Sequence, residues 1–77
     1  MKKYQTYLND LITKSTNAEY FAWFVKMDLE INPIEVQVKY NFTSLEREQL
    51  ESTPSQELKK YFNENKMKEN DWIYANN

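Results

Sequence analysis

Apolar residues occupy every second position in two neighbouring stretches of this chain. In residues 21–31 the odd-numbered positions are all apolar, and residues 36–42 repeat the pattern at the even-numbered ones. Strict alternation gathers apolar side chains on one face of a β-strand, whereas a helix scatters them around its axis. The pattern therefore predicts an antiparallel β-hairpin over about residues 20–42, with one apolar face.

The dipeptide Asn32-Pro33 predicts the turn of this hairpin, since Asn suits the first position and Pro the second position of a type I turn. A four-residue loop then sets Asp28 opposite Lys39. A two-residue loop would set Lys26 opposite Lys39, and like charges directly across a sheet are unfavourable. Charge and turn chemistry therefore predict the same strand register.

Residues 18–31 also carry a helical signal. The sequence Thr16-Asn17-Ala18-Glu19 fits a capping box, which would start a helix through Tyr20, Phe24 and Met27. The long alternation favours the strand over this helix. A helix over 18–31 stays the alternative.

Three helices are expected around the hairpin. A stripe of apolar residues predicts the first over residues 3–14, a capping box at Thr43 predicts one over 44–52, and Pro54 after Thr53 predicts one over 54–65. The tail, residues 66–77, is polar but carries Trp72-Ile73-Tyr74. These three residues fit a last helical turn, a third strand or a docking segment, and the sequence does not choose among them.

These elements predict a single α+β domain spanning residues 1–77, in the order α-β-β-α-α, with the hairpin packed on helices. A chain of 77 residues buries only a little over ~60% of its unfolded surface. Because the sequence has no Cys and no His, neither disulfides nor His/Cys metal sites stabilise it. A partner chain, such as a second copy in a homodimer, is the remaining source of additional stability.

Composition also limits the chemistry. Without Cys and His there is no thiol nucleophile, no imidazole base and no Ser-His-Asp triad. Without Gly, the phosphate-binding P-loop and the dinucleotide fingerprint are excluded. Asp28 and Glu30 are spaced as a general acid and base on a strand, but charged side chains are usual on a half-exposed sheet. We therefore expect a protein that is not an enzyme and that uses no cofactor.

Charge and hydropathy give the expected location. Ten basic and twelve acidic residues leave a net charge of −2, too small to draw the chain to nucleic acid or anionic lipid. No apolar segment follows Met1 as in a signal peptide, and we expect a cytoplasmic protein. Lysine and asparagine are frequent, as in A/T-rich genomes, and this favours a bacterial, phage or plasmid accessory protein.

The predicted function is a protein-interaction module that self-associates or binds a protein partner through the open hairpin edge and exposed aromatics. The candidate partner-binding residues are Tyr20, Phe24, Lys26, Lys39, Trp72 and Tyr74. The alternative is nucleic-acid binding on the outer sheet face, with aromatic rings stacking on bases and lysines contacting phosphates.

Overall fold

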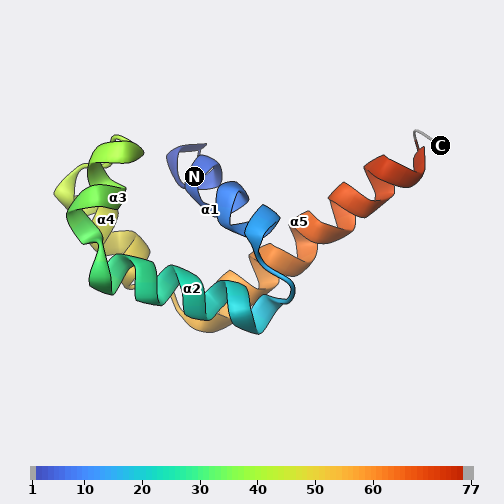
Figure 1. Ribbon diagram of the computed structural model, residues 1–77, viewed down its shortest axis with the longest axis horizontal. Coiled ribbons are helices and arrows are strands. Elements are labelled where there is room, and N and C mark those ends of the chain that lie inside the picture. Colours follow the sequence, from blue (N-terminus) through green and yellow to red (C-terminus); the bar gives the residue numbers. More distant parts are fainter. Residues whose placement is uncertain (1, 76–77) are drawn as a thin grey trace.

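The computed structural model describes the backbone of residues 2–75 and the side chains of residues 4–66, and all of its regular structure is α-helical (Figure 1). The helices are α1 (Lys2–Lys14), α2 (Ala18–Ile31), α3 (Pro33–Lys39), α4 (Ser44–Glu51) and α5 (Ser55–Ala75). No strand occurs within residues 2–75, so the predicted α+β fold with a hairpin over 20–42 is wrong. Within the described part of the chain, no helix has both the length and the apolar character needed to cross a bilayer.

Helix α2 replaces the first predicted strand. Its N-cap is Asn17, whose side-chain oxygen accepts a hydrogen bond of 2.8 Å from the backbone N–H of Tyr20. The alternative of a helix over 18–31 was therefore correct, although the N-cap is Asn17 rather than Thr16. The helix also gains by packing against α1, α3 and α5, whereas an isolated two-stranded hairpin is marginal in water.

The alternating apolar residues of α2 have a simple helical meaning. At about 100° per residue, positions four apart lie in one row and positions two apart lie on nearly opposite sides of the helix. The alternation therefore divides into two rows, one of Phe21, Val25 and Leu29 and the other of Trp23, Met27 and Ile31. The first row is buried, whereas in the second row Trp23 is 56% exposed and Ile31 is 64% exposed.

Helix α3 replaces the second predicted strand. Asn32 ends α2 and precedes α3, and Pro33 is the first residue of α3 rather than part of a hairpin turn. The φ angle that proline imposes suits both positions, so the turn signal was ambiguous. The predicted register is also wrong, because Val36 is buried while Val38 is 75% exposed.

Asn41 ends α3 in a left-handed conformation, with φ of 57°. The backbone N–H of Asn41 donates to the carbonyl of Val38 at 3.3 Å, and the N–H of Phe42 donates to the carbonyl of Gln37 at 2.9 Å. This pair of bonds is a Schellman motif. In a chain without glycine, asparagine takes the position that glycine usually fills.

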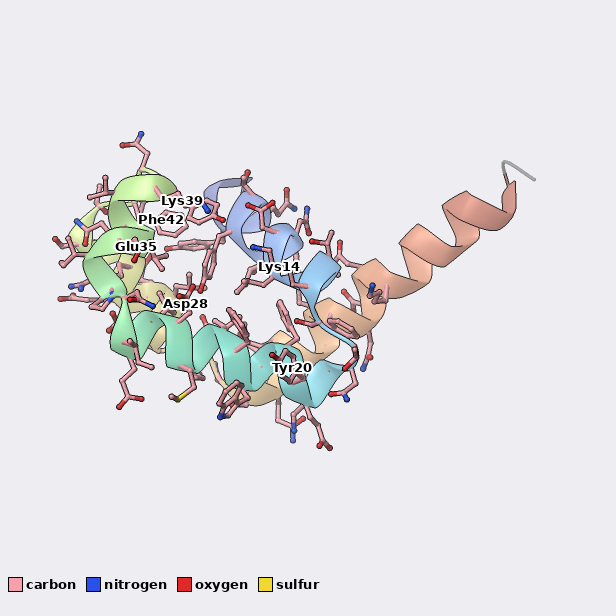
Figure 2. The ribbon with its side chains drawn as sticks, in the orientation of Figure 1. Lys14, Tyr20, Asp28, Glu35, Lys39 and Phe42 are labelled. Carbon is pink, nitrogen blue, oxygen red and sulfur yellow. The ribbon has the colours of Figure 1, made fainter. Side chains whose placement is uncertain are left out.

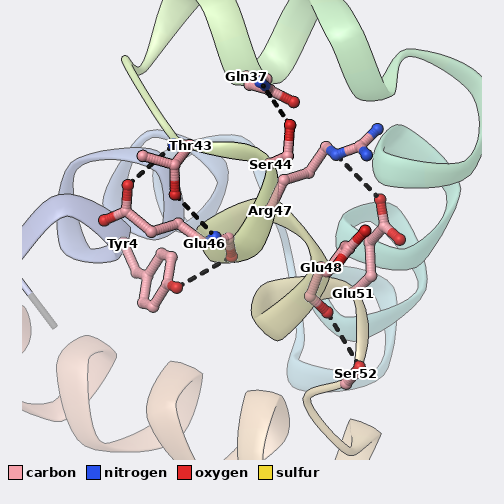
Figure 3. Close-up of polar contacts among 9 residues, drawn as sticks. All are labelled: Tyr4, Gln37, Thr43, Ser44, Glu46, Arg47, Glu48, Glu51 and Ser52. Atoms are coloured by element: carbon pink, nitrogen blue, oxygen red, sulfur yellow. Dashed lines mark hydrogen bonds and ion pairs between the residues drawn. The ribbon is translucent and has the colours of Figure 1, made fainter.

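Helix α4 begins at the capping box predicted from the sequence (Figure 3). The hydroxyl of Thr43 accepts from the N–H of Glu46, and the Glu46 carboxylate accepts from the N–H of Thr43. The Tyr4 hydroxyl donates to the carbonyl oxygen of Glu46 at 2.9 Å. This bond ties α1 to α4.

Most of the core lies between α1, α2 and the first half of α5, and α3 and α4 also contribute to it. Its buried apolar residues are Tyr7, Leu8, Leu11, Ile12, Phe21, Ala22, Val25, Leu29, Val36, Phe42, Leu50, Leu58 and Phe62. Helix α5 starts one residue after the predicted position and runs to Ala75, so that its second half extends away from the other helices (Figure 1). Trp72 and Tyr74 are therefore part of α5, and their side chains lie outside the described ones.

Candidate functional site

The candidate site is the side of α2 opposite its buried row, here called the outer face. It consists of Tyr20, Trp23, Phe24, Met27 and Ile31. One of its residues, Phe24, also packs partly against the core. At about 100° per residue these five positions fall within roughly 100° of arc, nearly opposite the buried row. Tyr20 is 43% exposed, Trp23 56% and Ile31 64%, while Phe24 and Met27 are half-buried.

On the outer face, the Tyr20 ring contacts two other aromatic rings. The ring centroid of Tyr20 lies 5.8 Å from that of Trp23 and 6.0 Å from that of Phe24, in tilted arrangements. Such ring pairs contribute about 0.5–1.5 kcal/mol beyond the burial of their area. The contacts of Tyr20 therefore join Trp23 and Phe24 into one aromatic cluster.

A groove of about 210 Å³ runs along this face. This outer groove is lined by Trp23, Phe24, Met27, Asp28, Ile31 and Asn32. Four of the six residues are apolar, and one of the two polar ones is a carboxylate. The groove therefore suits apolar side chains of a ligand, with a single acidic group at its edge.

A second hollow of about 160 Å³, the polar cleft, adjoins the outer groove. Phe24, Asp28 and Asn32 line both hollows. Figure 2 shows the charged residues of the cleft around the region between α1, α2 and α3, namely Lys14, Asp28, Glu35 and Lys39. The cleft therefore carries two cationic and two anionic side chains beside an apolar groove.

Asp28 is held in place by Tyr7. The Tyr7 side chain is buried, and its hydroxyl donates a 2.7 Å hydrogen bond to Asp28 Oδ2. Burial raises the pKa of Tyr7 above its ordinary value, and the hydrogen bond to Asp28 raises it further. Tyr7 therefore stays a protonated donor, and the Asp28 carboxylate is fixed at the boundary between groove and cleft.

Tyr40 forms the other side of the cleft. Its ring centroid lies 5.0 Å from that of Tyr7, and its hydroxyl donates to Asp10 Oδ2 at 2.7 Å. Desolvation, followed by this hydrogen bond, raises the pKa of Tyr40 to about 12. Lys39 Nζ lies 5.5 Å from the centroid of the Tyr40 ring, a cation–π distance.

The borders of the outer face are acidic. At about 100° per residue, Glu19 and Glu30 follow Trp23 on one side, and Asp28 follows Phe24 on the other. Lys26 lies beside Glu19 and Glu30, but its ammonium group is turned toward the chain between α4 and α5. Lys26 Nζ donates to the carbonyl oxygen of Glu51 at 2.8 Å and to that of Thr53.

The structure brings some of the predicted partner-binding residues together. Tyr20 and Phe24 share the outer face, and Lys39 lines the polar cleft together with Phe24. Lys26 is not part of this group, because its amine is bound to main-chain carbonyls. Trp72 and Tyr74, the other two predicted residues, are the members of the set whose side chains lie outside the described ones.

Sequence reasoning placed Trp23, Met27 and Ile31 in the core, which is wrong. They were assigned with Val25 and Leu29 because all five share one face of a strand. The signal that would have found them is the capping sequence before Ala18. Once a helix is assumed, the i, i+4 spacing separates Trp23, Met27 and Ile31 from the core row.

The outer face and the polar cleft present apolar side chains beside hydrogen-bonding and charged ones. Among the described residues there is no group of three or more acidic side chains positioned to hold a metal ion. Comparison with protein-family models, curated proteins and solved structures finds no match to this chain.

Proposed function

We propose that this protein is a small helical interaction module, and that the outer face of α2 binds an amphipathic helix of another protein. The observation that carries the proposal is that α2 is apolar on two opposite sides while the fold covers one of them. A helix that is apolar all round is normally buried. The uncovered side of α2 therefore supports a partner that completes its burial.

The spacing of the outer face suits a helical ligand. Tyr20, Trp23, Phe24, Met27 and Ile31 follow the i, i+3, i+4, i+7 pattern by which one helix packs on another. The outer groove lies within this row and offers room for apolar side chains of the ligand. Helix-in-groove binding uses such anchors on both partners.

The acidic borders favour a different protein over a second copy of this chain. In a two-fold dimer the same patch meets itself, so Glu19, Asp28 and Glu30 of both copies would gather at one interface. Like charges placed across an interface cost affinity. A partner helix with an apolar stripe and basic flanks avoids this repulsion and gains attraction instead.

A displayed library of helical peptides provides the test. Each peptide carries Leu, Ile, Met or Phe at four positions in the i, i+4, i+7, i+11 pattern, with randomised residues elsewhere. The library is selected on the wild-type protein, on Trp23→Ser and on Leu45→Ser. Leu45 is the matched control, because it is 63% exposed and lies on α4, outside the outer face.

We expect peptides that bind the wild type and Leu45→Ser but not Trp23→Ser. Selected peptides that bind Trp23→Ser equally well would contradict the proposal. Sedimentation of the protein alone gives a second check. A dimer that dissociates on Trp23→Ser substitution would show that a second copy, rather than another protein, covers the outer face.

The nucleic-acid alternative loses the geometry on which it depended. It required Tyr20, Phe24, Lys26 and Lys39 on one sheet face, and residues 2–75 contain no strand. Lys26 is also engaged with main-chain carbonyls rather than directed outward with the aromatics. Nucleic-acid binding stays a prediction, and its signature is affinity for oligonucleotides that falls steeply with salt.

A further inference from the structure

We infer that Asp28 determines which partner helices bind, by accepting a hydrogen bond from one Lys or Arg side chain that reaches from the outer groove into the polar cleft. This inference rests on the proposed function, because it concerns the same surface. It adds a specificity determinant and the chemistry of the residue that the determinant recognises.

Asp28 is the acidic residue that lines the outer groove itself. It lines both the outer groove and the polar cleft, whereas Glu35, Lys14 and Lys39 line the cleft alone. A partner side chain that leaves the groove toward the cleft therefore meets Asp28 before it meets the lysines. At the edge of an apolar groove, a carboxylate selects a hydrogen-bond donor, and most strongly a charged one.

The Asp28 carboxylate is preorganised for this role. Its Oδ2 accepts the 2.7 Å hydrogen bond from the buried Tyr7, which fixes the orientation of the group. Its Oδ1 lies 3.5 Å from Asn32 Nδ2, a long and weak contact. Oδ1 therefore keeps the capacity to accept a shorter, charge-assisted bond from a partner without loss of the bond to Tyr7.

The size of the cleft limits what enters it. A volume of about 160 Å³ is well below the roughly 300–1,000 Å³ of sites for drug-sized ligands. It suits one long side chain. The Phe24 side chain lines both hollows, and an aromatic ring attracts a cation placed over its face.

Lys14 and Lys39 restrict the cation to the Asp28 side of the cleft. Both lysines line the cleft, and the Lys39 ammonium lies against the Tyr40 ring. A second basic residue of the partner placed beside either lysine would meet like charge. The expected partner therefore carries a single basic residue next to its apolar stripe at this point.

The helical peptide library tests the inference on the wild type, Asp28→Asn and Glu48→Gln. Asp28→Asn removes the charge and keeps an oxygen that accepts from Tyr7. Glu48→Gln removes the same charge from an exposed position on α4. We expect the peptides selected on the wild type and on Glu48→Gln to be enriched in Lys or Arg at one position beside their apolar stripe. Peptides selected on Asp28→Asn should show no such enrichment.

One selected peptide is then compared with its Lys→Gln version by calorimetric titration. The neutral version should bind the wild type about tenfold more weakly, and both versions should bind Asp28→Asn with similar affinity. Thermal unfolding of Asp28→Asn, followed by circular dichroism, confirms that the variant is folded.

The two proposals fail in different ways. Equal binding of the Lys and Gln peptides to the wild type, with binding still lost on Trp23→Ser, would overturn the role of Asp28 and leave the proposed function standing. If the selected peptides bind Trp23→Ser as tightly as the wild type, the proposed function is overturned, and the role of Asp28 with it.

Discussion

Leu29 and Ile31 are two residues apart on α2, yet they lie on opposite sides of it. Leu29 is 3% exposed and packs in the core, whereas Ile31 is 64% exposed and lines the outer groove. The pair separates the side of α2 that stabilises the fold from the side proposed to bind a partner.

Truncation of these two aliphatic side chains should therefore have unequal effects. Leu29→Ala leaves a cavity in the core and should lower the free energy of unfolding by about 3 kcal/mol. Ile31→Ala should change it by less than about 0.5 kcal/mol, because an exposed side chain loses few contacts. Urea unfolding followed by circular dichroism measures both, and equal losses would contradict the two-sided arrangement of α2.

Removal of the Tyr7 hydroxyl should destabilise the protein. Tyr7→Phe keeps the ring but deletes the donor to Asp28, and hydrogen bonds to charged groups contribute roughly 1.5–3 kcal/mol. We expect a loss near the lower limit of that range in urea unfolding. Tyr40→Phe is the comparison, and its loss should be about 0.5 kcal/mol, because water replaces the donor to Asp10 in that exposed contact.

Stability should fall in alkaline solution. The pKa of Tyr7 and of Tyr40 is raised by desolvation and by hydrogen bonds to carboxylates, to about 12 for Tyr40. An unfolded tyrosine ionises near pH ~10. Below that pH the stabilisation is fully present, and above it the unfolded state loses protons that the folded state retains. The free energy of unfolding should therefore decline from about pH 10 upward, most steeply while Tyr7 stays protonated.

Unfolding in urea at a series of pH values measures this decline, and native tyrosinate absorbance reports the titration directly. Tyr7→Phe should show a shallower slope than the wild type above pH ~10, by up to about 1.4 kcal/mol per pH unit. If all six tyrosines of the native protein ionised together near pH ~10, the assigned environments of Tyr7 and Tyr40 would be wrong.

Lys26 should contribute to stability through the end of α4. Its ammonium group donates to the carbonyl oxygens of Glu51 and Thr53, where the helix leaves carbonyls without intrahelical partners. Lys26→Met keeps the aliphatic part of the side chain but removes the donor. It should lower the free energy of unfolding by about 1 kcal/mol and so lower the melting temperature. Lys60→Met makes the same charge change at an exposed position of α5 and should leave the melting temperature nearly unchanged.

The left-handed Asn41 provides a test of the turn after α3. Asn41→Ala should cost about 1 kcal/mol, because a Cβ is unfavourable at φ of 57° and alanine lacks the short polar side chain that helps asparagine there. Asn41→Gly should stay within about 0.5 kcal/mol of the wild type. Thermal unfolding compares the stability of the two variants. An alanine variant as stable as the glycine variant would contradict the left-handed conformation of Asn41.

The helices with clear end signals were predictable from the sequence. The capping box at Thr43 lies at the start of α4, and Pro54 precedes α5. These signals are local, since a cap is a hydrogen bond between a side chain and a backbone only three residues away. The far end of α5 was missed, because the apolar residues of 66–75 are not spaced as a helical stripe and so do not indicate where the helix stops.

The candidate site was only partly predictable. Tyr20 and Phe24 were singled out because they fall off the apolar face of the predicted strand, and both lie on the outer face of α2. Trp23 and Ile31 were hidden by the same strand assumption, which placed them in the core. The boundary role of Asp28 depends on Tyr7, which lies 21 positions away in the chain, and no local pattern indicates that contact.

By itself, the sequence determined that every odd-numbered position of residues 21–31 is apolar, and that an asparagine before them can cap a helix. Only the tertiary structure decided between the two meanings of that alternation. A strand places all such residues on one side, and a helix divides them into two rows at about 100° per residue. Packing of one row against α1 and α5 selected the helix and left the other row uncovered. The alternating residues that predicted a hairpin thus divide, in the folded protein, into a row that packs in the core and a row on the proposed binding face.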